Sequence, residues 1–97
     1  MIGLEEMRLN GITKLTFKLT NAQRLDVMML NVPDTHGTIV LMSRSVYVYK
    51  NRRPHEIISE LKEYAEVMTP YMTLSDLWNE LDGFLGGSLG ADVVVRW

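Results

Sequence analysis

Polar and apolar residues alternate over residues 13–20, and this is the clearest strand signal in the chain. Leucine, phenylalanine and a second leucine occupy positions 15, 17 and 19, with lysine or threonine on either side of each. A period of two places one kind of side chain on each face of an extended strand. The pattern predicts a strand with one buried face and one face open to solvent.

Residues 24–32 form a second run whose period is ambiguous. Asn21 and Ala22 separate it from the first strand, as expected for a tight hairpin. Thr20 and Gln23 also match a helical capping box, so a helix that begins at Thr20 is the alternative. We favour the strand, because a hairpin gives the first strand a hydrogen-bonded partner.

A turn and two further apolar runs follow. The sequence PDTHG at residues 33–37 predicts a turn, in which proline presets φ and glycine permits a positive φ. Residues 38–42 and 46–50 are then two more predicted strands, with a break or bulge at residues 43–45.

The second half of the chain carries two helical stripes. Pro54 suits the first position of a helix, and Thr69-Pro70 ends that helix because the residue before proline avoids the helical region. Thr73 and Asp76 form a capping pair for a second helix, which Gly86-Gly87 stops. The apolar positions of the two stripes follow the 3.6-residue period: Ile57, Ile58, Leu61, Ala65 and Met68, then Leu74, Leu77, Trp78, Leu81 and Leu85.

These elements predict a single α+β domain over residues 1–97. Its sheet is a mostly antiparallel β-meander of about four strands. Two amphipathic helices follow, and a C-terminal strand at residues 93–95 returns to the sheet. Residues 1–10 form either a short helix or an added strand.

The predicted sheet has more apolar surface than two helices can cover. Residues 28–30, 39–42 and 93–95 are apolar on both sides, whereas an antiparallel sheet with one solvated face normally alternates. A second copy of the chain is the simplest cover, so a homodimer is expected. The alternative is that residues 1–10 or a curled sheet cover this face.

Charge is segregated along the chain. Residues 1–53 carry eight basic and four acidic side chains, and residues 54–97 carry two basic and eight acidic ones. Such a polar molecule can steer a charged partner or pair with itself. The simpler alternative is that each set of charges only solvates an exposed face.

The composition further narrows the possible classes of protein and of functional site. The chain is 46% hydrophobic and 23% charged, which is ordinary for a globular domain. It has no cysteine, which excludes disulfides, thiolate metal sites and cysteine nucleophiles. No apolar run approaches the roughly 18 residues of a membrane span, and the N-terminus is acidic where a signal peptide is basic. A cytoplasmic protein without a membrane partner is the expectation.

Residues that carry chemistry are scarce. His36 and His55 do not have the spacing of metal ligands, and no serine lies in a nucleophile elbow. The glycines at 83, 86, 87 and 90 come before a strand, whereas phosphate loops follow one. We therefore expect no catalytic residue, no metal and no cofactor, and we do not expect an enzyme.

The one basic cluster is Lys50-Asn51-Arg52-Arg53. It follows the strand in which Tyr47 and Tyr49 share one face and Val46 and Val48 the other. Aromatic rings on a sheet beside basic residues are typical of proteins that stack single-stranded nucleic acid. A nucleic-acid-binding module that uses Tyr47, Tyr49, Lys50, Arg52 and Arg53 is one functional alternative.

Residues 46–97 locally resemble barstar, the family of intracellular ribonuclease inhibitors. The resemblance lies in the order strand, helix, helix, strand and in the run LSDLWNELDG at residues 74–83. It implies an acidic helix face that occupies the basic active site of a nuclease. Ser75 and Asn79 stand where that family places its key acids, and Asp76, Glu80 and Asp82 are their neighbours.

The leading hypothesis is a small non-enzymatic interaction module, a homodimer that binds a basic protein surface through an acidic helical face. Acids supply the charge and an aromatic side chain the anchor. The expected protein-binding residues are Glu56, Glu60, Glu63, Asp76, Glu80 and Trp97.

Overall fold

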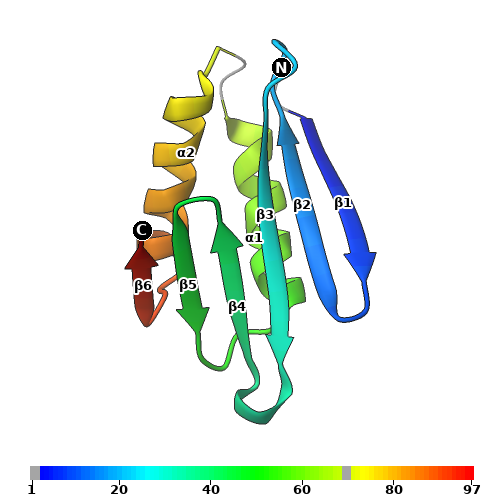
Figure 1. Ribbon diagram of the computed structural model, residues 1–97, viewed down its shortest axis with the longest axis vertical. Helices are drawn as coiled ribbons and strands as arrows, with labels where there is room; N and C mark the ends of the chain where they lie inside the picture. Colours follow the sequence, from blue (N-terminus) through cyan, green and yellow to red (C-terminus); the bar gives the residue numbers. More distant parts are fainter. Residues whose placement is uncertain (1–2, 69–70) are drawn as a thin grey trace.

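A six-stranded antiparallel sheet forms one layer of the molecule, with its strands side by side in chain order. The computed structural model describes residues 3–68 and 71–97 (Figure 1). The α+β class and the antiparallel sheet are confirmed, but the expected number of strands was too low. The strands are β1 (Gly3–Leu9), β2 (Ile12–Lys18), β3 (Arg24–Val32), β4 (Gly37–Met42), β5 (Ser45–Tyr49) and β6 (Val93–Arg96).

The first ten residues supply the additional strand, so the short helix considered for them is wrong. β1 pairs with β2 across a two-residue turn in which Asn10 and Gly11 both have positive φ, at 43° and 82°. This is the turn that matches the twist of a hairpin. Glu6 forms an ion pair between β1 and the first helix, because its carboxylate lies 2.6 Å from Lys62 Nζ. Hydrogen bonds from Lys62 and Arg8 lower the pKa of Glu6.

Residues 24–32 form β3 along their whole length, and a helix beginning at Thr20 is wrong. The hairpin turn places Ala22 at a φ of 67°, and the Asn21 side chain accepts the N–H of Gln23 at 3.2 Å. The alternating side chains Leu25, Val27 and Met29 are buried. Tertiary burial therefore decides a period that the local sequence leaves open.

The turn at residues 33–37 is present, but glycine does not supply its left-handed residue. Pro33–Thr35 form one 3-10 turn (η1), and His36 takes the positive φ, at 51°. Gly37 is required for a different reason. A Cβ at this position would lie 2.4 Å from the backbone oxygen of Tyr49 on β5.

Replacing Gly37 by alanine should therefore lower the free energy of unfolding by about 1–3 kcal/mol, because backbone rather than a flexible side chain must move. Urea denaturation measures the loss. Gly83→Ala is the matched control: a Cβ there meets nothing within 4 Å. Because Gly83 is helical, this variant should gain up to about 1 kcal/mol. Equal midpoints for the two variants would contradict the close approach at Gly37.

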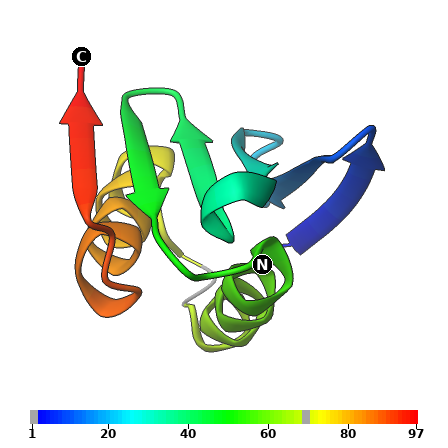
Figure 2. The same cartoon turned by 90° about the horizontal axis from the view of Figure 1, so that it is seen from below.

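The two helices, α1 (Pro54–Val67) and α2 (Leu74–Gly83), pack on one face of the sheet, as Figure 2 shows. The expected cap is present, because Thr73 Oγ1 accepts the N–H of Asp76 at 3.1 Å. The predicted stop at Thr69-Pro70 lies outside the described residues. The stop at Gly86-Gly87 is wrong, since α2 runs directly into a π-helical turn, η2 (Phe84–Ser88), and the left-handed residue is Gly90.

One core cluster lies between this helix layer and the sheet. The sheet contributes alternate residues, among them Leu15, Phe17, Val27, Met29 and Val40. The helical side contributes Ile57, Ile58, Leu61, Leu77, Leu81 and Leu85, most of both predicted stripes. Tyr47 and Tyr49 also point into this core, and Val46 and Val48 point away from it.

Candidate functional site

The face of the sheet turned away from the helices, here called the open sheet face, carries two apolar rows. Residues paired across neighbouring strands lie on the same face, so the registers define each row. The first row contains Leu9, Ile12, Leu30, Ile39, Val48 and Val93. The second contains Met28, Leu41, Val46 and Val95.

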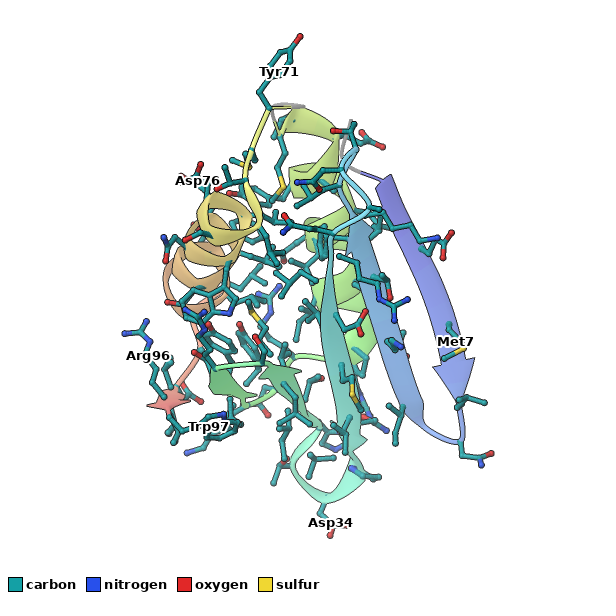
Figure 3. The ribbon with its side chains drawn as sticks, turned by 45° about the horizontal axis from the view of Figure 1, so that its top comes forward. Met7, Asp34, Tyr71, Asp76, Arg96 and Trp97 are labelled. Atoms are coloured by element: carbon teal, nitrogen blue, oxygen red, sulfur yellow. The ribbon has the colours of Figure 1, made fainter. Side chains whose placement is uncertain are left out.

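No described helix covers these rows. Figure 2 shows both helices on the other side of the sheet. Val93 and Val95 are each 48% exposed, and the inner members of the rows are only partly buried by their neighbours. The expected surplus of apolar sheet surface is therefore present. β1 extends the sheet instead of covering it, with Met7 near the outer edge in Figure 3.

The polar corner of the open sheet face lies on β1, β2 and the start of β3. Its charges are largely paired: Lys18 Nζ lies 2.6 Å from Glu5, and Lys14 Nζ lies 3.7 Å from Asp26. Arg24 has no carboxylate partner among the residues that the structure describes. This corner is therefore nearly neutral.

The outer surface of α1 and α2, here called the acidic helix layer, carries uncompensated negative charge. Glu56, Glu63, Glu66 and Asp76 are exposed, and none has an ion-pair partner within the described ranges. Glu60, by contrast, pairs with Arg52. Three of the predicted acids, Glu56, Glu63 and Asp76, are thus exposed on the helices without a described partner, whereas the charge of Glu60 is compensated.

Glu80 lies in a groove between the two helices. The Tyr64 hydroxyl donates to its carboxylate at 3.0 Å, and the Tyr64 ring stacks on Phe84 with centroids 4.2 Å apart. Burial, with Glu80 as acceptor, raises the pKa of Tyr64 to about 12. Glu80 therefore links the two helices by a hydrogen bond as well as adding charge to their surface.

Asp82 does not belong to the acidic helix layer. Its side chain is turned inward, where it accepts from the Tyr47 hydroxyl and from Ser45 Oγ at 3.2 Å. Arg96 Nη2 reaches its other oxygen at 2.7 Å. This buried cluster joins α2 to β5 and β6. The sequence gives no local sign of this cluster, because Asp82 lies 37 residues from Ser45 and 35 residues from Tyr47 in the chain.

Trp97 is separate from the acids. It is 70% exposed, and its indole Nε1 donates to the backbone oxygen of Ser43 in the β4–β5 turn at 3.2 Å. Figure 3 shows Arg96 and Trp97 at the same end of β6. Its ring is available to a partner, but from the strand end and not from the helices.

The residues of the nucleic-acid alternative are not arranged for stacking. Tyr47 and Tyr49 are 0% and 1% exposed, so their rings cannot contact bases, and this part of the prediction is wrong. Their hydroxyls are bonded to Asp82 and to the Leu85 carbonyl, and burial raises the pKa of Tyr49. Such partners let the large rings sit in the core.

The basic cluster itself lies at the surface. Lys50 is exposed, and Arg52 is engaged by Glu60. Arg53 donates to Asn31 at 3.4 Å and lies 2.7 Å from His36 Nδ1.

The described part of the chain contains no group of three or more histidine or acidic side chains that could hold a metal ion.

Comparison of the chain with protein-family models, curated proteins and solved structures returned no match. The strand, helix, helix, strand order of residues 46–97 is present as β5, α1, α2 and β6. In the run that resembles barstar, Asp76 and Glu80 face solvent, whereas Asp82 is buried. Among the described residues, no helix is both long and apolar enough to cross a membrane.

Proposed function

We propose that this chain is a non-enzymatic interaction module. Two copies pair through the open sheet face, and each copy offers its acidic helix layer to a basic protein surface. The observation that carries the proposal is the pair of apolar rows, which cross the sheet on the side away from both described helices. Exposed, contiguous apolar surface of this kind is typical of interaction sites.

The open sheet face is large enough for a specific interface. Six strands about 4.8 Å apart span about 24 Å, and strands of this length run for roughly 20 Å. The whole face, polar corner included, therefore offers on the order of 500 Å² per copy, or about 1,000 Å² in a dimer, which is the threshold for a biological interface. Sheets pack face to face in this way with their side chains interdigitated.

Charge favours a second copy as the occupant of this face. The ion pairs of its polar corner, Lys18–Glu5 and Lys14–Asp26, are closed within one chain. Arg24 is the uncompensated charge among the described residues of this corner, so two such faces repel each other only weakly. The acidic helix layers do repel each other, because Glu56, Glu63, Glu66 and Asp76 are uncompensated by the described residues. Self-association through the sheet leaves both acidic layers pointing outward.

The first test is the molar mass in solution, measured by size-exclusion chromatography with light scattering. The proposal expects twice the 11.1 kDa of a single chain. A mass of one chain throughout the micromolar to millimolar range would overturn the dimer. The variants that locate the interface are argued in the Discussion.

Reversing two acids of the acidic helix layer should weaken binding to a basic partner. The double variant Glu56→Lys/Glu63→Lys is expected to bind an arginine-rich peptide at least about tenfold more weakly, because direct charge pairing is replaced by repulsion. Fluorescence anisotropy with labelled peptide at low and physiological salt measures the change.

The matched control is Asp34→Lys/Asp92→Lys. It changes the net charge equally, but both positions lie outside α1 and α2. Equal loss in the two variants would mean that the peptide responds only to net charge, and would contradict a specific acidic layer.

A further inference from the structure

The sheet has a notch where β3 outruns β4. β3 has nine residues and β4 has six, and their pairing stops at Met28 opposite Leu41. Residues 24–27 of β3 pair with β2 on one side but have no partner strand on the other. A cavity of about 580 Å³ lies at this notch, between the start of β3, the β4–β5 turn and the start of α2.

The cavity has an apolar wall and a polar mouth. Apolar side chains come from three elements: Leu25, Met28, Leu41, Met42, Leu74 and Trp78. Ser43 and Ser75 add hydroxyls, and Arg24 and Arg44 add positive charge. Its volume lies within the range of small-molecule sites, which combine a mostly apolar lining with a few polar groups.

The charge at the mouth is not compensated by any residue that the structure describes. Asp26 is the only acid among the described lining residues, and its carboxylate is occupied by Thr16 Oγ1 at 2.8 Å and by Lys14 Nζ at 3.7 Å. Neither Arg24 nor Arg44 forms an ion pair within residues 3–68 and 71–97. Two guanidinium groups are therefore free to receive an anion.

Trp78 links the mouth to the wall. The Arg44 guanidinium lies over its ring, 5.2 Å from the centroid. Its indole Nε1 is buried and finds no acceptor in the described structure. A buried donor without a partner is costly, so an acceptor from a water molecule or a ligand is expected beside it.

We propose that this cavity binds a small amphipathic carboxylate. The apolar chain or ring of the ligand lies against Leu25, Leu74 and Trp78, and its carboxylate pairs with Arg24 and Arg44. The choice of an anion follows from the two uncompensated arginines, and the choice of an apolar body follows from the lining. Met28 and Leu41 of the lining also belong to the second apolar row of the open sheet face, but the inference itself does not depend on the proposed interaction function.

Octanoate is the probe for the test, with octanol as its neutral analogue and butyrate as its short one. In a Trp97→Phe background Trp78 is the sole tryptophan, so its fluorescence reports binding directly. Octanoate should give a saturable change, and calorimetry should give the same Kd. Octanol should bind at least about tenfold more weakly because it lacks the charge. Butyrate should also bind at least about tenfold more weakly than octanoate, because it buries fewer methylene groups.

Arg44→Gln and Arg24→Gln should each weaken octanoate binding at least about tenfold and leave octanol binding unchanged. Arg8→Gln is the matched control, because Arg8 lies on β1 outside this cavity. Urea midpoints and molar masses should match those of the parent, which separates this result from folding and from self-association. The proposal is overturned if octanoate gives no saturable signal, if octanol binds as tightly, or if Arg8→Gln has the same effect as Arg44→Gln.

Discussion

Replacing Asp82 by alanine should lower the free energy of unfolding by about 3 kcal/mol. The carboxylate accepts from the Tyr47 hydroxyl and from Ser45, and both donors are buried. Without it, each donor is left in the core without an acceptor, at about 1–3 kcal/mol per group. The Arg96 pair adds little, since that side chain is 62% exposed. Urea denaturation followed by circular dichroism measures the loss.

Three further variants make this prediction specific. Asp92→Ala is the matched control, because Asp92 is exposed and its only described bond is a backbone one, from its N–H to the Val48 oxygen. Asp82→Asn keeps an acceptor oxygen and should lower the free energy of unfolding less than Asp82→Ala does. Tyr47→Phe should lower it by about 1 kcal/mol. This effect of Tyr47→Phe should nearly vanish when residue 82 is already alanine. Equal stability of Asp82→Ala and Asp92→Ala would show that the cluster does not hold α2 to the sheet.

The elements with a clean period were predictable from sequence alone. β2 alternates strictly, and the two helical stripes bury the residues that the 3.6-residue period selects. β1 was ambiguous for a physical reason. Leu4 faces the helix layer, whereas Met7 and Leu9 face the other side, so the apolar residues of this edge strand are out of phase. Glu6 takes an inward position because Lys62 of α1 pairs with it there, and Arg8 pairs with Glu6 on the same strand.

The candidate sites were harder to predict, because they depend on which face of each element turns inward. β5 is apolar on both faces, and only the acceptors at Asp82 and Leu85 explain why its tyrosines are the buried set. Asp82 lies at the boundary of the α2 stripe, next to Leu81, and no local signal separates it from a solvated acid. The notch at β3 arises from unequal strand lengths, whose boundaries sequence patterns locate poorly.

Replacing Ile39 by lysine should convert the dimer to a monomer. Ile39 lies in the middle of the first apolar row, between Leu30 on β3 and Val48 on β5. In a face-to-face dimer this lysine would be taken out of water without a partner, which costs several kcal/mol. A loss of about 2.8 kcal/mol already raises Kd a hundredfold. Light scattering across a dilution series should give the mass of one chain for this variant.

Thr16→Lys is the matched control. It introduces the same charge from another β-branched residue of the open sheet face, but opposite Asp26 in the polar corner. It should remain a dimer. Val95→Lys covers the possibility that Ile39→Lys fails to fold: Val95 is 48% exposed on the edge strand β6, so lysine costs the single chain little there.

Together these three variants locate the interface. If the open sheet faces meet, Ile39→Lys and Val95→Lys both dissociate the dimer, and Thr16→Lys does not. A dimer formed instead by pairing of two β6 edges would rest on backbone hydrogen bonds, which lysine side chains on the sheet face leave intact. Survival of the dimer in both Ile39→Lys and Val95→Lys, with native circular dichroism, would therefore exclude the open sheet face as the interface.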